Sequence, residues 1–241
     1  MRPRALSIVV PAYNEQARVA ATLDEMITYC RQVGREVEIL VVDDGSEDRT
    51  PNVVNEVASQ FPEVRLIRLD RNRGKGFAVR VGMLEATGTR VIFADADGAT
   101  PIAELQSLES ALDDGADIAI GSRAIRVEGV KLRARWYRRV IGRIFHGFVS
   151  LIGVRGFADT QCGFKLFTAH SARAIFSRAC VDRFAFDIEV LLIAVRLGYR
   201  VVEVPVNWNH KPGSRINLLT DSARMLFDVL RIRLSLLGGV R

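Results

Sequence analysis

The sequence predicts an α/β protein with a Rossmann-like, mostly parallel sheet flanked by helices. Two observations support this fold class. Short β-branched runs alternate with longer helical stretches in the first half of the chain, and a polar cluster follows each short run. Such alternation produces a doubly wound sheet, whose ligands bind at the carboxyl ends of the strands. We therefore expect one binding site along one edge of the sheet.

Apolar runs rich in valine and isoleucine predict buried strands, and the segments between them have the length and polarity of helices. The last of these helices has a clear start, since Thr100 can cap it and Pro101 suits its first position. The expected strands are 6–10, 37–42, 64–69, 91–94 and 117–120, and the expected helices are 15–31, 49–61, 75–86 and 101–114.

A cluster of polar residues and glycines follows each expected strand. These clusters are PAYNE at 11–15, DDGS at 43–46, RNRGKG at 71–76, DADG at 95–98 and GSR at 121–123. Because the carboxyl ends of parallel strands meet at the same edge of a sheet, the clusters predict a single composite site.

The composition is that of a globular protein with an anionic partner. Of the 241 residues, 49% are hydrophobic and 26% are charged, and the net charge is +6 at pH 7. This balance suits nucleic acid, anionic lipid or a phosphorylated substrate. The three cysteines have no CxxC spacing, which argues against a disulfide framework. No segment reaches the ~18 uncharged apolar residues of an ordinary transmembrane helix.

Asp95 and Asp97 place two carboxylates at the end of an expected strand. Hard oxygen ligands suit Mg²⁺ or Mn²⁺, and such an ion commonly binds substrate phosphates as well. It would neutralise charge on a departing nucleoside diphosphate. A solvated turn can carry the same two carboxylates without a metal, but the neighbouring phosphate-friendly loops favour a metal site.

The segment GKG at 74–76 resembles part of a dinucleotide fingerprint, but Val79 occupies the position of the third glycine. We interpret the segment as a loop that brings Lys75 to a phosphate; the alternative is a simple turn into a helix. The sequence has no Walker A motif, which argues against a P-loop NTPase.

Together, the clusters of the first half resemble glycosyltransferase family 2, whose catalytic domain has the GT-A fold. Motifs of the second half resemble the dolichyl-phosphate glucosyltransferase-like branch, which is related to dolichol-phosphate mannose synthase. These motifs are GSR at 121–123, DTQCGFK at 159–165, FAFDIE at 184–189 and EVPVNW at 203–208. The resemblance covers nearly the whole chain, from Leu6 to about Asn217, and implies a hexosyltransferase.

The resemblance implies a role for each matching position. The nucleotide would be held by Pro11, Ala12, Tyr13, Glu15, Asp43, Asp44, Lys75, Asp95 and Ala96, and the metal by Asp95 and Asp97. Asp97 and Asp159 are the implied catalytic residues. The acceptor phosphate would meet Arg123, Arg138 and Arg215, and the sugar and acceptor pocket would include Gln161, Asp187 and Glu189.

The implied reaction is the metal-dependent, inverting transfer of a hexose from a nucleotide-diphosphate sugar to a polyprenyl or dolichyl phosphate. UDP-glucose or UDP-N-acetylhexosamine is the expected donor; the alternatives are a GDP-mannose donor or a soluble glycan acceptor. Two positions depart from the mannose synthases. Ala99 stands where they tend to have glutamine as an extra metal ligand, and Gly142 stands where they tend to have serine. The acceptor contact at Gly142 is therefore left open.

The role expected of Asp159 depends on the acceptor. A phosphate monoester has a second pKa of ~6, so at neutral pH it is already a dianionic nucleophile. Arginines would hold it, since their planar guanidinium groups suit bidentate phosphate contacts. Asp159 would then orient more than deprotonate, whereas a sugar hydroxyl acceptor would make it a true base. A capping or salt-bridging aspartate is the structural alternative.

A cationic run between Lys131 and Arg143, followed by the apolar stretch 144–154, predicts an interfacial amphipathic helix at about 131–154. Each cation near anionic lipid contributes ~1 kcal/mol to binding. The alternative is a core helix with a solvated basic edge. Residues 218–241 predict a second amphipathic helix that packs on the first, lies on the membrane or forms a homodimer contact. We expect a catalytic domain at 1–217, peripheral on the cytoplasmic face of the membrane.

Nucleic acid is not an expected partner despite the positive charge. The basic run contains few aromatic residues, Trp136 and Tyr137, on which bases could stack. No RNA-binding motif is present in the sequence.

Overall fold

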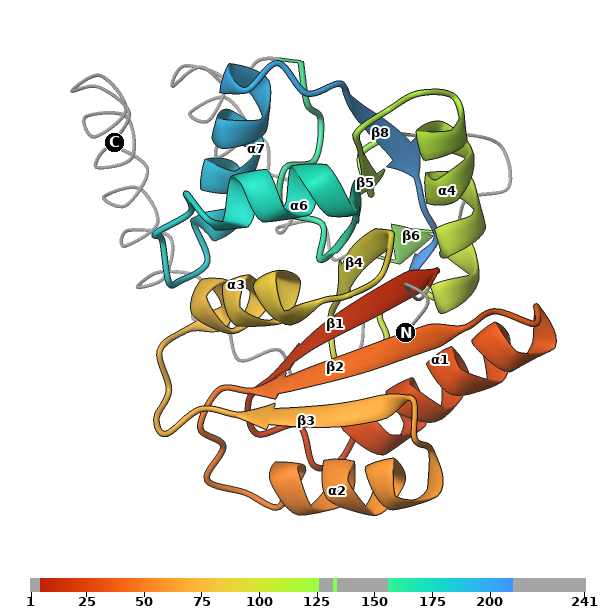
Figure 1. The fold of residues 1–241 in the computed structure, drawn as a ribbon, viewed down its shortest axis with the longest axis vertical. Coiled ribbons are helices and arrows are strands. Elements are labelled where there is room, and N and C mark those ends of the chain that lie inside the picture. The colour runs from red at the N-terminus through yellow and green to blue at the C-terminus, as the bar shows by residue number, and fades with distance from the viewer. Residues whose placement is uncertain (1–4, 126–131, 134–155, 210–241) are drawn as a thin grey trace.

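The computed structural model describes residues 5–125, 132–133 and 156–209. Strands and helices alternate along most of this part of the chain (Figure 1). The strands are β1 (Leu6–Ala12), β2 (Val37–Asp43), β3 (Val64–Arg68), β4 (Arg90–Ala94), β5 (Ile118–Ser122), β6 (Leu132–Arg133), β7 (Phe164–Thr168), β8 (Val201–Pro205) and β9 (Trp208–Asn209). The helices are α1 (Val19–Gln32), α2 (Thr50–Gln60), α3 (Lys75–Glu85), η1 (Ile102–Glu104), α4 (Leu105–Asp113), α6 (Ala169–Phe176) and α7 (Phe186–Arg196).

Seven of the described strands form one sheet in the order β3-β2-β1-β4-β7-β5-β8. β1 pairs in parallel with β2 and β4, β2 pairs in parallel with β3, and β5 pairs in parallel with β8. β7 is antiparallel to both of its neighbours, β4 and β5. The predicted mostly parallel sheet is therefore confirmed, with one reversed strand in its interior.

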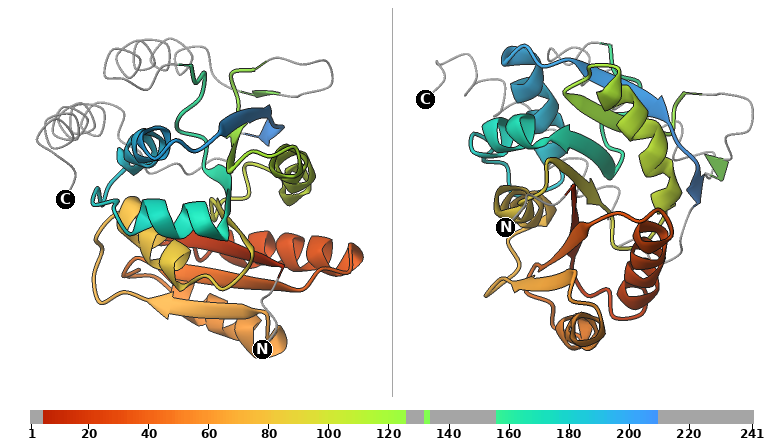
Figure 2. Two further views of the ribbon diagram at one scale, coloured as in Figure 1. Left: turned by 45° about the horizontal axis from the view of Figure 1, so that its top comes forward. Right: turned by 45° about the vertical axis from the view of Figure 1, so that its right-hand side comes forward.

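Helices cover both faces of this sheet (Figures 1 and 2). On one face, α1, α2 and α4 bury apolar residues such as Leu23, Val54 and Leu108. On the other face, α3, α6 and α7 bury residues such as Val79 and Phe176. Coverage on both faces explains why the parallel strands are almost continuously apolar, and it confirms the doubly wound arrangement.

The expected strands all form, and their ends lie within two residues of the expected ones. The helix expected from 15 begins at Val19, because the residues before it form the loop that ends β1. The helix expected from 101 begins as the short turn η1 at Ile102. Pro101 has an extended backbone with ψ of 139°, so Thr100 is not the cap that the sequence suggested.

β7 was not expected from the sequence. Its residues, FKLFT, form a short run that Lys165 interrupts at a position that proves to be fully buried. A lysine in such a run normally indicates an exposed residue, because lysine is almost never fully buried unless it is paired. The sequence therefore did not indicate this strand, because its lysine is buried. The partner of that lysine lies in helix α7, which is distant in the sequence.

The structure describes little of the two segments expected to be amphipathic helices. Leu132 and Arg133 form β6, which pairs with β9, so these two residues of the expected segment 131–154 are not helical. The rest of that segment and the expected helix 218–241 lie outside the described residues. Within the described ranges, no helix combines the length and the apolar character needed to span a bilayer.

Candidate active site

The polar clusters meet at one edge of the sheet, as the strand–helix alternation predicts. Ala12 at the end of β1 lies beside Asp43 at the end of β2, and the register of β1 with β4 brings Asp95 to the same edge. β7 runs in the opposite direction, so its first residue, Phe164, pairs with Ala94. The reversed strand thus brings the segment 159–163 to the clusters that follow the parallel strands. We call this the site edge.

The loop after β1 is fixed by hydrogen bonds to the loop after β2. Asn14 has a left-handed backbone (φ 53°), and its N–H donates to Ser46 Oγ at 2.8 Å. Its side-chain oxygen accepts from the backbone amides of residues 47 and 48. The predicted nucleotide-binding residues here are Pro11 and Ala12, which are buried at the end of β1, and Tyr13 and Glu15, which are half-buried in the loop. The Glu15 carboxylate pairs with Arg18 at 2.6 Å.

Asp44 holds the loop that leads to Lys75. Its buried carboxylate accepts the backbone N–H groups of Arg73 and Gly74, each at 2.8 Å. Gly74 has a φ of 108°, a conformation that L side chains rarely adopt. Burial raises the pKa of Asp44, while the two amide hydrogen bonds oppose that rise. Asp44 therefore fixes the backbone just before α3, whose first residue is Lys75.

Asp43 lies buried next to a hollow at the end of β3. Its carboxylate accepts the Ser46 N–H at 3.3 Å and lies 3.6 Å from the Arg68 guanidinium. The hollow has a volume of about 450 Å³, within the range of small-molecule pockets. It is lined by Arg68, Leu69, Asp70, Arg71, Arg73 and Phe77. The hollow is therefore strongly cationic, and the Arg73 guanidinium lies over the Phe77 ring at 3.5 Å from its centre.

Asp95 and Asp97 follow β4 directly, and both are partly exposed. The Asp95 carboxylate pairs with Lys75 Nζ at 2.5 Å. Between the two aspartates, Ala96 is buried, and its carbonyl accepts the Thr22 hydroxyl at 2.9 Å. The buried Ala96 thus anchors the turn, and the carboxylates on either side of it lie at the site edge.

These two carboxylates fit a divalent cation that also binds a diphosphate. Burial and the neighbouring Asp95 charge raise the pKa of Asp97, while the Ala99 N–H and the Lys75 charge oppose that rise. Within the described ranges, no group of three or more His, Cys, Asp or Glu could hold a metal by itself. Mg²⁺ commonly binds through one or two carboxylates and substrate phosphates, which matches this incomplete site. Ala99 adds no side-chain ligand, and its carbonyl accepts the Asn209 N–H at 2.8 Å.

Arg123 and Asp159 form a bidentate ion pair on the other side of the site edge. Arg123 Nε and Nη2 donate to the two oxygens of Asp159 at 2.6 and 2.8 Å, and the Arg123 backbone N–H donates at 2.9 Å. Burial by itself raises the pKa of Asp159, but the Arg123 charge and hydrogen bonds outweigh it and hold that pKa below its usual range. Glu203 accepts the Asp159 N–H at 2.8 Å and so fixes the backbone of this pair.

The structure gives the predicted pocket residues Asp187 and Glu189 other partners. The Asp187 carboxylate accepts from the fully buried Lys165 ammonium, a residue that we did not single out from the sequence. The Glu189 carboxylate accepts the backbone N–H groups of Cys180 and Val181, at 2.8–3.1 Å. Both acidic side chains thus bind groups of the protein itself.

The remaining predicted residues are only partly described. Gln161 is half-buried, and its N–H donates to an Asp159 oxygen at 3.2 Å, which places it beside the ion pair. Arg138 and Arg215, the other predicted phosphate ligands, lie outside the described residues.

Comparison with known proteins places the chain in a family. The model of the family described as glycosyl transferase family 2 matches residues 7–183. A protein of Mus musculus named dolichyl-phosphate beta-glucosyltransferase is 40% identical over 250 residues, which cover 98% of this chain and 77% of the relative. Proteins of the same name from Dictyostelium discoideum and Saccharomyces cerevisiae are 38% and 35% identical, and each alignment covers 98% of this chain and 76% of the relative.

Solved structures show the same fold. Glucosyl-3-phosphoglycerate synthase from Mycobacterium tuberculosis, in complex with Mn²⁺, UDP and glucosyl-3-phosphoglycerate, has a TM-score of 0.69 and covers 96% of this chain and 79% of its own. At 20% sequence identity this similarity concerns the fold alone, and it confirms the expected GT-A architecture. Since the family model and the near-full-length relatives agree, the chain is a glycosyltransferase and belongs to glycosyl transferase family 2.

Proposed function

We propose that this enzyme transfers a hexose from a UDP-sugar to a polyprenyl or dolichyl phosphate, with UDP-glucose as the leading donor. The observation that carries the proposal is the near-full-length similarity, at 35–40% identity, to relatives named dolichyl-phosphate beta-glucosyltransferase. The site supports it independently, because its described residues provide carboxylates for a metal on one side and a guanidinium group on the other.

The donor side comprises the loops after β1, β2 and β4. We assign the base and ribose to the segment 11–15 and to Asp43 and Asp44, which lie at adjoining strand ends. Lys75, at the start of α3, would face the diphosphate together with Asp95 and Asp97. A bound Mg²⁺ or Mn²⁺ supplies positive charge that stabilises the leaving nucleoside diphosphate. Complexes of the M. tuberculosis enzyme with UDP and with Mn²⁺ or Mg²⁺ make such a donor reasonable for this fold.

The acceptor side comprises Arg123 and Asp159, with Arg138 and Arg215 as further proposed phosphate ligands. Burial lowers the pKa of Arg123, but the Asp159 carboxylate outweighs it, and the Asp95 charge adds to the rise. The segment 159–163 joins the two sides, since Asp159 pairs with Arg123 and Gly163 lies against the Asp95 side chain. Holding a phosphate acceptor next to a diphosphate requires cations of this kind, because two anions repel each other.

The low pKa of Asp159 bears on the reaction. A carboxylate whose pKa lies below its ordinary value is a weak base at neutral pH, and a general base works best with a pKa near the working pH. A phosphate dianion needs no deprotonation, whereas a sugar hydroxyl does. We therefore propose direct inverting displacement on a phosphate acceptor, in which Asp159 orients Arg123, since both of its oxygens accept from that guanidinium.

The acceptor lipid requires the enzyme to reach a membrane surface. We propose that the basic and apolar segment 131–154 binds the cytoplasmic face peripherally, and that 218–241 packs beside it or forms a dimer contact. The catalytic domain would then comprise residues 1–217.

The proposal is tested with a panel of labelled UDP- and GDP-sugars, Mn²⁺ or Mg²⁺, and a short polyprenyl phosphate. We expect organic-extractable label from UDP-glucose or another UDP-hexose. Label from GDP-mannose alone would replace the donor assignment, and label on an added soluble glycan would replace the acceptor assignment. The absence of labelled lipid with every donor would refute the proposed function.

A further inference from the structure

One buried ion pair near the site edge has no role in the chemistry described so far. Lys165 of β7 is fully buried, and its ammonium donates to the carboxylate of Asp187 at the start of α7, which is also buried. The same ammonium donates to the Cys162 carbonyl at 2.8 Å and lies 5.2 Å from the centre of the Phe93 ring.

The pair is joined to the metal-binding carboxylate through the turn that precedes β7. Lys165 holds the Cys162 carbonyl, and the next residue, Gly163, accepts the Asp95 N–H at 3.1 Å. A Cβ atom at Gly163 would lie 2.1 Å from Asp95 Oδ2, so this turn is in direct contact with the Asp95 side chain. A displacement of the turn would therefore displace Asp95.

Lys75 is joined to the pair through Asp95. The Lys75 ammonium contacts the Asp95 carboxylate at 2.5 Å. A displacement of the turn that moves Asp95 would therefore also move the partner of Lys75.

Stability alone does not explain the burial of such a pair. Replacing a buried ion pair by apolar side chains of similar volume is often neutral or stabilising, because two charges must be desolvated. By contrast, residues that contact and orient metal ligands commonly contribute to metal affinity, and their loss weakens metal binding about 10–100-fold.

We propose that the ion pair of Lys165 and Asp187 positions Asp95 and Lys75 for the metal and the donor diphosphate. This inference rests on the proposed function, since it assumes a divalent cation at Asp95 and Asp97. It assigns Lys165 and Asp187 as positioning residues that act on Asp95 through the Cys162–Gly163 turn, and on Lys75 through its contact with Asp95.

The test compares two kinds of variant by Mn²⁺ affinity in the presence of UDP, measured by electron paramagnetic resonance of free Mn²⁺. The double variant Lys165→Met, Asp187→Leu removes the pair and fills its space with apolar atoms. We expect its thermal midpoint to stay within about 4 °C of wild type while its Mn²⁺ affinity falls about 10–100-fold. Gly163→Ala leaves the core intact, and we expect it to weaken Mn²⁺ binding by at least about tenfold.

Glu38→Gln provides the matched control. Glu38 is a buried carboxylate at the amino end of β2 that accepts from Ser7 and Thr87, so its loss perturbs the core far from the metal ligands. We expect it to lower the thermal midpoint and leave Mn²⁺ affinity within about twofold of wild type.

Three outcomes overturn the inference. Wild-type affinity in the folded double variant shows that the pair is only structural. Wild-type Mn²⁺ affinity in Gly163→Ala shows that the turn does not position Asp95. This result remains decisive if the double variant does not fold. Failure of the wild-type protein to bind Mn²⁺ with UDP refutes the proposed function and this inference together, whereas the first two outcomes leave the proposed function intact.

Discussion

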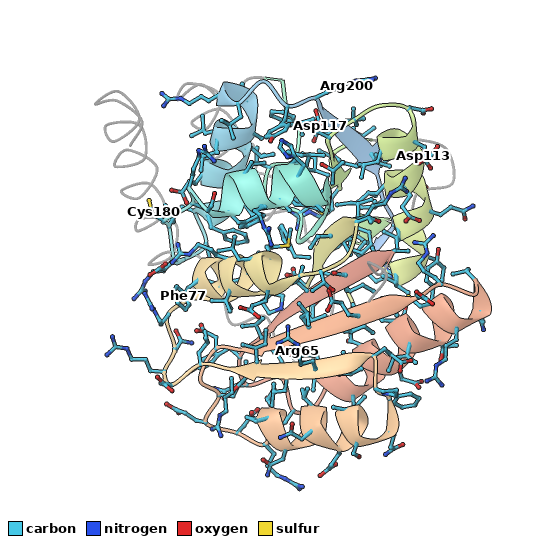
Figure 3. All side chains as sticks on the ribbon, in the orientation of Figure 1. Arg65, Phe77, Asp113, Asp117, Cys180 and Arg200 are labelled. Carbon is cyan, nitrogen blue, oxygen red and sulfur yellow. The ribbon has the colours of Figure 1, made fainter. Side chains whose placement is uncertain are left out.

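Two ion pairs, one near the site edge and one at the opposite edge of the central sheet, are buried to very different degrees. At the site edge, Lys165 and Asp187 expose 0% and 6% of their side chains. At the opposite edge, Arg65 and Glu85 lie 3.6 Å apart and expose 51% and 56%. Other charged residues of that opposite edge, Asp113, Asp117 and Arg200, gather near α4 and β8 in Figure 3.

The charged groups of an exposed pair stay solvated by water, whereas those of a buried pair are held in one geometry by the protein. An exposed pair contributes ~0–1 kcal/mol to stability, because water solvates both partners. A buried or partly buried pair must offset the loss of that solvation, which it does only with close geometry and additional hydrogen bonds. The site edge provides both, as the bidentate contact of Arg123 with Asp159 shows. We infer that the ordered charges of the site edge serve binding and catalysis more than stability.

The largest effect is expected from Asp97→Ala. Loss of one of the two proposed metal-binding carboxylates should lower transfer by at least about 100-fold, because charge on the leaving diphosphate would no longer be neutralised. Sugar transfer to lipid is measured at saturating Mn²⁺, with circular dichroism as the control for folding. Activity close to wild type would show that Asp97 is not a metal ligand.

A smaller effect is expected from Asp159→Asn. The amide cannot balance the Arg123 charge, and breaking a fully buried pair costs ~3–5 kcal/mol. Because the Arg123 side chain is 33% exposed, we expect a smaller loss than for a fully buried pair. The free energy of unfolding should fall by about 2 kcal/mol. Urea unfolding measures the loss. If the variant is as stable as wild type, the ion pair does not hold this loop.

The same aspartate predicts a dependence of stability on pH. The folded pKa of Asp159 is held below its ordinary value by Arg123, so its contribution is complete above the unfolded value of ~3.9 and is lost as pH falls through the folded value. The difference in unfolding free energy between wild type and Asp159→Asn should therefore be constant at pH 5–7. It should shrink below about pH 4. A difference that grows on acidification would contradict the assigned direction.

The smallest effect is expected at the opposite edge. Arg65→Ala and Glu85→Ala should each change the free energy of unfolding by less than about 0.5 kcal/mol, because the pair is exposed and widely spaced. Urea unfolding and the transfer assay should both resemble wild type. A loss as large as that of Asp159→Asn would remove the distinction between the two edges.

The sequence was informative about local patterns and less so about distant partners. The strands β1 to β5 and the clusters that follow them were predictable, since each depends on a short apolar run and the residues directly after it. The parallel strand β8 was not among the expected strands. β7 was not, because its buried Lys165 is stabilised by Asp187, which lies 22 positions away in the sequence. The contact of Arg123 with Asp159 likewise depends on β7 being antiparallel, a feature that no local pattern in the sequence indicates.

The most direct test of the proposed chemistry compares two acceptors that differ in charge. Wild-type enzyme, Mn²⁺ and labelled UDP-glucose are incubated with a polyprenyl phosphate or with the polyprenol of the same chain length, and label in the organic phase is measured. Because the proposed acceptor is a phosphate dianion, which needs no deprotonation, and Arg123 holds both oxygens of Asp159, we expect label on the phosphate and none on the alcohol. Equal labelling of the alcohol, or labelling of the alcohol alone, would contradict a site built for a phosphate acceptor.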